Sequence, residues 1–185
     1  VGASDRAASL GRYVLENIKK SGFQGAIHPV NPRHNLLGGL RCVARLGDIG
    51  SAVDLVVVTT PAAAVAQVIR DAGAAGIRNA VVLSAGFGET GAAGRALEQQ
   101  VHQAARESRV RLVGPNCLGI MRPAIGLNAS FAPSAALPGR LAFVGQSGAM
   151  VTAVLDWARE RGIGFSTFVS LGDGLDVDLG DLLDY

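Results

Sequence analysis

Six short segments combine glycine with proline, asparagine, glutamine or small hydroxyl residues, and each stands where a strand is expected to end. Such residues let backbone N–H groups approach an anion closely, and a helix that begins beside them adds partial positive charge. Each segment alone is also compatible with an ordinary strand-to-helix turn, but six together favour a ligand that carries phosphates. The segments are Gly2-Ala3-Ser4, Val30-Asn31-Pro32, Thr59-Thr60-Pro61, Ser84-Ala85-Gly86-Phe87, Gly114-Pro115-Asn116-Cys117 and Gly145-Gln146-Ser147-Gly148.

The last of these segments has two functional interpretations. With Ala149 after it, the segment nearly spells G-x-S-x-G, the strand–serine–helix elbow of α/β-hydrolases. That elbow needs a histidine later in the chain, whereas all three histidines precede Ser147. We therefore favour a cradle in which Ser147 and the N–H groups of Gly148 and Ala149 hold a phosphate, with a plain N-cap serine as the alternative.

The first segment is not a dinucleotide-binding fingerprint. G-x-G-x-x-G is absent, and Asn31-Pro32 stands where that fold carries an acidic residue for the ribose. An NAD-dependent dehydrogenase is therefore disfavoured. Arg33 is placed to meet a ribose phosphate instead, and a solvated loop arginine is the alternative.

Histidine and cysteine predict no metal site. His28, His34 and His102 show no H-x-x-x-H spacing, and no C-x-x-C occurs. Cys117 stands in a strand-end loop near the expected ligand, although a buried, unreactive thiol is the commoner explanation. Cys42 and Cys117 are too few for a disulfide framework, which indicates a reducing compartment and hence the cytoplasm.

Alternating strands and helices must position these segments. The expected strands are residues 26–30, 40–43, 53–59, 79–84, 110–113, 141–144 and 165–170, and the expected helices are residues 10–20, 61–76, 89–108 and 147–161, with Pro61 at the first helical position. Residues 114–139 contain four prolines and are expected to be a long connection at a domain boundary. This order predicts an α/β fold with parallel sheets and right-handed crossovers.

Composition agrees with that fold and excludes several classes. Of 185 residues, 25 are glycine, 49% are hydrophobic and only 5% are aromatic, so small aliphatic residues must build the core. The net charge of +2 without basic runs argues against nucleic-acid binding, and no apolar stretch is long enough for a membrane span. The chain begins close to a turn and ends in the first turns of a helix at residues 178–185, so we expect a fragment of a longer protein.

The series of loops resembles the NDP-forming acyl-CoA synthetases, relatives of the succinyl-CoA ligase alpha subunit. The motifs that carry the resemblance span the chain in order: Gly2-Ala3-Ser4, Gly22-Phe23-Gln24-Gly25, Pro29-Val30-Asn31-Pro32-Arg33, Ser84-Ala85-Gly86-Phe87-Gly88-Glu89, Gly114-Pro115-Asn116-Cys117-Leu118-Gly119, Asn128-Ala129-Ser130-Phe131-Ala132-Pro133, Gly145-Gln146-Ser147-Gly148-Ala149 and Ser170-Leu171-Gly172-Asp173. The resemblance implies a Rossmann-like CoA-binding domain at residues 1–123 and the first part of a flavodoxin-like ligase domain at residues 124–185.

In that family an acid, CoA and ATP interconvert with acyl-CoA, ADP and phosphate through an acyl phosphate and a phosphohistidine. The resemblance assigns the CoA diphosphate to Gly2, Ala3 and Ser4, and the nucleotide end to Asn31, Pro32 and Arg33. It places Thr60, Pro61 and Ser84 along the same site, Asn116 and Cys117 near the thiol end, and Gln146, Ser147 and Gly148 at the phosphate of the phosphohistidine. It also implies oligomeric assembly and a separate ATP-grasp domain or subunit that handles ATP and Mg²⁺.

The resemblance also implies limits. The phosphohistidine is expected beyond Tyr185, so no catalytic residue is expected in this chain, which we expect to bind CoA or acyl-CoA without turnover. Asp173 stands where many relatives carry asparagine. Two other functions remain open: a regulatory acyl-CoA-binding region of a GNAT-type protein acetyltransferase, and a non-catalytic CoA-binding module.

Overall fold

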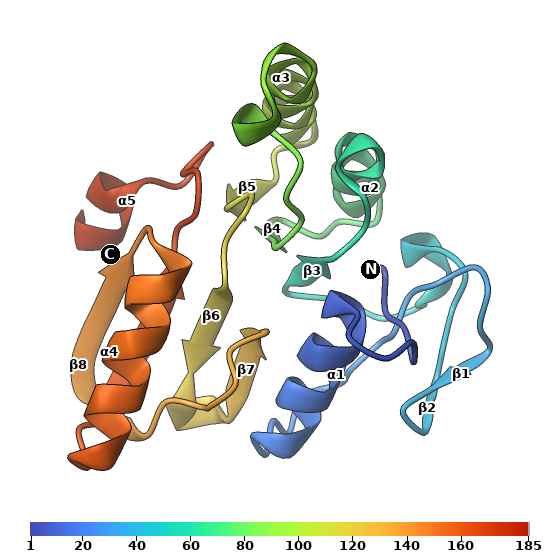
Figure 1. The fold of residues 1–185 in the computed structure, drawn as a ribbon. Coiled ribbons are helices and arrows are strands. Elements are labelled where there is room, and N and C mark those ends of the chain that lie inside the picture. Colours follow the sequence, from blue (N-terminus) through green and yellow to red (C-terminus); the bar gives the residue numbers. More distant parts are fainter. Residues whose placement is uncertain (185) are drawn as a thin grey trace.

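The computed structural model of this chain describes residues 1–184, and it confirms the predicted α/β fold. Two main sheets and one small hairpin contain the strands (Figure 1). The helices are α1 (Leu10–Lys20), α2 (Ala62–Ala74), α3 (Ala92–Ser108), α4 (Gly148–Glu160) and α5 (Leu179–Asp184).

The first sheet has three parallel strands in the order β3 (Val56–Val58), β4 (Asn79–Val82) and β5 (Arg111–Val113). Their β-branched side chains suit a sheet that is covered on both faces. Helices α2 and α3 pack against each other and against this sheet. The core between them is aliphatic, and Val58, Ile69 and Leu112 are fully buried in it.

Residues 26–30 do not form the strand that we predicted. Within this segment only Val30 makes a bridge, a parallel one to Val43, and a cavity borders the rest of the segment. A strand needs a partner along its length, which these residues lack on that side. The predicted strand at residues 40–43 is the shorter β2 (Leu40–Arg41), which pairs with β1 (Leu36–Leu37) in the small hairpin.

The second sheet has four strands in the order β7 (Leu127–Ser130), β6 (Gly119–Arg122), β9 (Phe165–Ser170) and β8 (Pro138–Gly145). Only β8 and β9 are parallel, because β6 runs antiparallel to both β7 and β9. The prediction of purely parallel sheets was therefore wrong here. Residues 114–139 are also no simple connection, because a 3₁₀ turn (Pro123–Ile125) joins β6 and β7 into a hairpin.

Several helix boundaries differ from the prediction by a few residues. Pro61 is the N-cap of α2 and not its first residue, since its ψ of 147° is extended. Helix α3 begins at Ala92 and not at Glu89, which belongs to a separate 3₁₀ turn (Gly88–Thr90). The helix expected at residues 178–185 is α5, and Tyr185 lies outside the described residues.

The predicted division at residue 123 falls between β6 and β7, which pair with each other, and it stays a prediction. No helix among residues 1–184 has both the length and the apolar character that crossing a bilayer requires.

Candidate functional site

The first strand-end loop lies tightly against α1 and the end of β3. Gly2 has a φ of +84°, and a side chain on it would come within 2.8 Å of Thr59 Oγ1. A side chain on Gly11 would collide with the carbonyl oxygen of Gly2. Glycine is therefore required at both positions, because the loop and the helix backbone approach each other closely.

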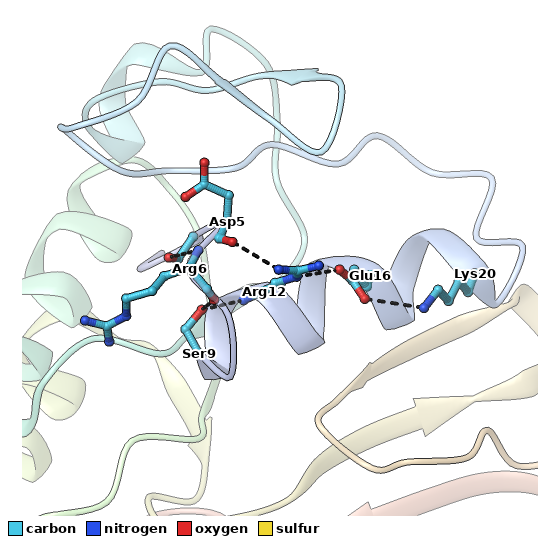
Figure 2. A network of polar contacts seen from close by, with 7 residues as sticks. Asp5, Arg6, Ser9, Arg12, Glu16 and Lys20 are labelled. Carbon is cyan, nitrogen blue, oxygen red and sulfur yellow. Dashed lines mark hydrogen bonds and ion pairs between the residues drawn. The ribbon is translucent and has the colours of Figure 1, made fainter.

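Polar contacts hold the rest of this loop on α1 (Figure 2). The Ser9 hydroxyl accepts the N–H of Arg12 as the helix N-cap and donates to Arg6 O at 2.9 Å. The Arg12 guanidinium donates to Asp5 O and lies 2.7 Å from a Glu16 carboxylate oxygen. The Arg12 contact, and after it a contact from Lys20, lower the pKa of Glu16. The predicted residue Ser4 accepts the Arg6 N–H at 3.0 Å, so its hydroxyl already takes part in the loop.

Asn31 joins the first loop to the second. Its side-chain amide donates to Ala3 O at 2.7 Å, and its side-chain oxygen accepts the Arg33 N–H at 2.9 Å. The structure thus brings the predicted Gly2–Ser4 and Asn31–Arg33 segments together, with Asn31 as the link. Pro32 and Arg33 are exposed beside it.

A side-chain hydrogen bond also joins the loops that follow β3 and β4. The Ser84 hydroxyl is buried and donates to Thr60 O at 2.5 Å. Thr60 Oγ1 is buried and has no hydrogen-bond partner within the described chain. Next to it, Pro61 begins α2 without a side-chain cap. Backbone N–H groups at this helix N-terminus can therefore donate hydrogen bonds to a bound anion.

Asn116 and Cys117 follow β5 but face different surroundings. Asn116 is exposed, has a φ of +55°, and donates its backbone N–H to Ser84 O at 2.9 Å. The Cys117 thiol is buried 3.3 Å from Val82 O, and burial raises its pKa to about 12. Cys117 is therefore a protonated thiol under the loop, in agreement with the unreactive alternative.

The predictions missed the carboxylates that hold the fourth strand-end loop, at residues 84–88. Glu89 accepts the N–H groups of Gly86 at 2.5 Å and Phe87 at 2.9 Å, and Glu98 accepts that of Gly88 at 3.0 Å. The Gly86 bond is the main reason that the pKa of Glu89 is lowered. A glutamate three residues after a glycine loop was the available signal, since its side chain can turn back onto the loop.

The predicted phosphate loop lies at the end of β8. Ser147 is exposed and is the N-cap of α4, where its hydroxyl accepts the Met150 N–H at 3.4 Å. Gln146 is exposed and Gly148 is partly exposed, with open space around Gly148. Ser147 is thus the N-cap that the alternative interpretation described. A phosphate role at this helix N-terminus stays a prediction.

A short series of bonds connects this loop to the others through the end of β9. Leu171 N–H donates to Gly145 O at 2.8 Å, and Asp173 N–H donates to Pro115 O at 3.0 Å. The Asn116 side-chain amide also donates to the Asp173 carboxylate at 3.3 Å. Ten of the eleven residues predicted at the first sheet form a row, with Cys117 buried beneath its last member Asn116. Gln146–Gly148 is connected to this row through the junction.

The described part of the chain has no group of three or more His, Cys, Asp or Glu side chains that could hold a metal ion. Both cysteines are buried and unpaired.

Comparisons with known proteins match both parts of the chain. Residues 1–123 match the CoA binding domain family, and residues 138–185 match the succinyl-CoA ligase-like flavodoxin domain. The chain is 38% identical over its whole length to acetate–CoA ligase [ADP-forming] I of Archaeoglobus fulgidus, of which it covers 27%. It is 35% identical to the alpha subunit of acetate–CoA ligase [ADP-forming] I of Pyrococcus furiosus, of which it covers 41%.

Solved structures agree with these matches. The dinucleotide-forming acetyl-coenzyme A synthetase 1 of Candidatus Korarchaeum cryptofilum, solved with phosphate and ADP, superposes with a TM-score of 0.93 at 38% identity. The superposition covers 99% of this chain and 39% of that one. This chain therefore spans well under half the length of these three proteins.

Proposed function

The chain belongs to the CoA binding domain family, and on that premise we propose that its row of strand-end loops binds coenzyme A or an acyl-CoA. The family match of residues 1–123 is the observation that carries the proposal. The row runs from Gly2–Ser4 through Asn31–Arg33, Thr60, Pro61 and Ser84 to Asn116, and hydrogen bonds join its neighbours.

The start of α2 supports an anion at the centre of the row. Its N-terminus carries no side-chain cap, and the neighbouring Thr60 Oγ1 has no partner among residues 1–184. A diphosphate at this place would accept backbone N–H groups and meet the partial positive charge of the helix. The Gly2–Ser4 loop begins beside it, since Gly2 lies next to Thr59.

The two ends of CoA are assigned by their chemistry. Arg33 is the exposed cation at one end of the row and is proposed to meet the nucleotide phosphate. Asn116 is exposed at the other end, near which the thiol would lie. Cys117 supports this end from below as a buried packing residue and takes no part as a nucleophile.

We further propose that the whole protein is an ADP-forming acid–CoA ligase, as its relatives are named. In that reaction the CoA thiol attacks the acyl carbon of an acyl phosphate and phosphate leaves, so fixed donors for the phosphate stabilise the transition state. Gln146, Ser147 and Gly148 at the start of α4 are proposed to supply such donors. ATP, Mg²⁺ and the phosphohistidine would be handled by an ATP-grasp partner and by residues outside this chain, in an oligomer in the cytoplasm.

Calorimetric titration of the chain with CoA tests the binding proposal. We expect binding that weakens as salt increases, and a loss of about fivefold to tenfold in affinity for Arg33→Ala, the effect of one charge-assisted phosphate contact. The control is Arg140→Ala on β8, which removes the same charge from an exposed position on the second sheet. A folded chain that does not bind CoA would contradict the proposal.

Labelled ATP added to the full-length protein separates the ligase from its two alternatives. An acid-labile phosphohistidine supports the ligase. CoA binding without phosphorylation would instead favour a regulatory or non-catalytic CoA-binding module.

A further inference from the structure

The sequence motif at residues 128–133 belongs to none of the strand-end loops. It contains most of β7 and the three residues that follow this strand. Strand β7 stands at one end of the sheet order β7-β6-β9-β8, so one of its sides faces no strand of this sheet. The backbone groups on such an outer side need other partners.

The side chain of Asn17 in α1 supplies partners on this outer side. Phe131 N–H donates to Leu118 O, so Phe131 faces the side of β6. Because neighbouring residues of an extended chain alternate, the carbonyls of Ser130 and Ala132 face outward. The Asn17 amide donates to both of them, to Ser130 O at 2.9 Å and to Ala132 O at 3.0 Å. Asn17 therefore bonds two alternate carbonyls, as a neighbouring strand would.

The side chains of the motif hold the two carbonyls in place. The Ser130 hydroxyl is buried, donates to Asn128 Oδ1 at 2.6 Å and accepts the Ala132 N–H at 3.2 Å. On the helix side, Asn17 O accepts the Ser21 N–H at 3.0 Å and also the Ser21 hydroxyl. Both sides of the contact are thus fixed by bonds of their own, which makes its geometry specific.

The other end of α1 carries the first ligand loop. A side chain on Gly11 would collide with Gly2 O, so the loop lies directly on the helix. Between the two ends, Val14 shares an apolar cluster with Phe131. Apolar contacts have no preferred direction and permit sliding, whereas hydrogen bonds to two alternate carbonyls define one register. Asn17 is therefore the residue of α1 that sets the position of the second sheet relative to the loop.

The second sheet is also attached to the first at another place. After β9, residues 173–177 run along β5, where Leu175 N–H donates to Gly114 O at 3.0 Å and Val177 N–H donates to Leu112 O at 3.1 Å. Figure 1 shows α5, to which this segment leads, and α1 on different sides of β5 and β6. A body attached at one place can rotate about it, whereas attachment at two separate places prevents rotation. The Asn17 contact is the second place.

We propose that Asn17 is a positioning residue, which holds the second sheet, and with it the start of α4, at a fixed distance from the CoA-binding row. The consequence for catalysis rests on the proposed function. Attack of the CoA thiol on an acyl phosphate requires the two groups to be placed to within about 1 Å. The fixed relation between the two sheets is independent of that function.

Spin labels on the chain test the fixed relation without ligand or turnover. Gln100→Cys on α3 and Arg159→Cys on α4 place the labels at exposed positions, while both native cysteines are buried. We expect Asn17→Ala to widen the distribution of label distances at least about twofold. The matched control Asn79→Ala removes an amide bond to Asp54 O at 3.0 Å beside the first sheet, and it should leave the distribution unchanged.

Kinetics of the full-length protein test the consequence. With ATP, CoA and acetate, the acid in the names of its relatives, we expect Asn17→Ala to lower kcat at least about tenfold. The Kd and KM for CoA should change less than about twofold, because the row itself is intact. A residue that only stabilised the fold would leave kcat of the folded protein unchanged, as we expect for Asn79→Ala.

An unchanged distance distribution in Asn17→Ala would overturn the proposal, and so would equal losses in kcat and in CoA affinity. If Asn17→Ala does not fold, Gly126→Ala must widen the distribution instead, because its methyl group would press the β6–β7 turn away from Gly22 beside the end of α1. A folded Gly126→Ala without that widening also overturns it. If the original protein binds no CoA, the proposed function fails, and the distances alone decide the position of Asn17 in this inference; they also decide it if acetate is not turned over.

Discussion

The two sheets of this molecule are stabilised by different means. The first sheet is buried between helices, and its core consists of alanine, valine, leucine and isoleucine with the single aromatic residue Phe87. In the second sheet, β8 contains no buried residue, and the core depends on Phe143, Phe165 and Phe168. Small residues allow close approach of backbones in the first sheet, whereas large rings fill the space beneath α4 in the second.

The strand-end loops of the two sheets also differ, because those of the first sheet are held by more hydrogen bonds. Backbone and side-chain bonds hold each loop of the first sheet, as Asn31, Ser84 and Glu89 show. The loop after β8 lies in open solvent around Gly148. A preformed row suits the binding of a large ligand, and an open helix N-terminus suits a phosphate that arrives and leaves.

Phe168→Ala should have the largest effect and should act on the second sheet first. Phe168 is fully buried, with its ring stacked 4.8 Å from that of Phe143, so we expect a loss of about 3–5 kcal/mol in the free energy of unfolding. Trp157, the only tryptophan, lies in α4 and reports this region by fluorescence. The control Leu141→Ala, at a half-exposed position, should lose less than about 1 kcal/mol. Equal losses would contradict an aromatic core.

Gly11→Ala should test the close packing of the first region. Its new methyl group would collide with Gly2 O, so we expect a loss of about 3 kcal/mol and weaker CoA binding. The matched change Gly148→Ala meets no atom within 4 Å and should leave stability within about 1 kcal/mol of the original. Chemical denaturation measures both, and a neutral Gly11→Ala would show that the loop is not tightly packed.

Asn31→Ala should separate the first two loops. It removes a bond to Ala3 O and leaves that acceptor and the Arg33 N–H without their partner, for which we expect a loss of about 1–2 kcal/mol. Asn35→Ala, at an exposed position in the same segment, is the control and should change stability by less than about 0.5 kcal/mol. Thermal melts of the two variants compare them directly, and identical melts would contradict the linking role.

The sequence predicted the strands that are buried on both faces, because their β-branched runs need no further context. Residues 53–59, which contain β3, are such a case. The strand predicted at residues 26–30 does not form, because a strand depends on a partner and the neighbouring cavity supplies none. The sequence does not predict the β6–β7 hairpin, because Pro123 and Gly126, which form its turn, are equally typical of a long connection.

The site was predictable at the level of loops, because parallel strands bring their carboxyl ends to one edge. Its internal bonds were not. Glu89 was expected to begin a helix, yet its carboxylate bonds two loop N–H groups and the helix starts later, at Ala92. Long-range partners such as Asn116 and Asp173 are set by packing between the two sheets, which periodicity does not encode.

Glu89→Gln should reveal how far a carboxylate fixes the loop at residues 84–88. Hydrogen bonds, chiefly from Gly86, lower the pKa of Glu89 in the folded state, so this group stabilises the protein above its ordinary range and loses that contribution as the pH falls through the folded pKa. The side chain is exposed, so we expect at most about 1 kcal/mol after solvent screening. Unfolding curves between pH 7 and about pH 3 should converge for the two proteins. Curves that stay parallel would contradict this role.

Asp173→Asn acts at the junction of the two regions and should have the smallest effect, in the opposite direction. Burial raises the pKa of Asp173, the Asn116 bond opposes that rise, and Glu89 and Glu98 add to it. The folded state therefore holds the proton more tightly than the unfolded state, and stability falls as the pH rises through the range between the two pKa values.

An asparagine at this position has no charge to desolvate and can still accept the Asn116 amide. We therefore expect Asp173→Asn to be more stable than the original protein at pH 7 by less than about 1 kcal/mol, and to lose the decrease between about pH 4 and pH 6. Asp54→Asn, at an exposed position before β3, is the control for simple charge removal. A less stable Asp173→Asn would mean that the carboxylate itself joins the two sheets, and the junction would then depend on charge and not on packing.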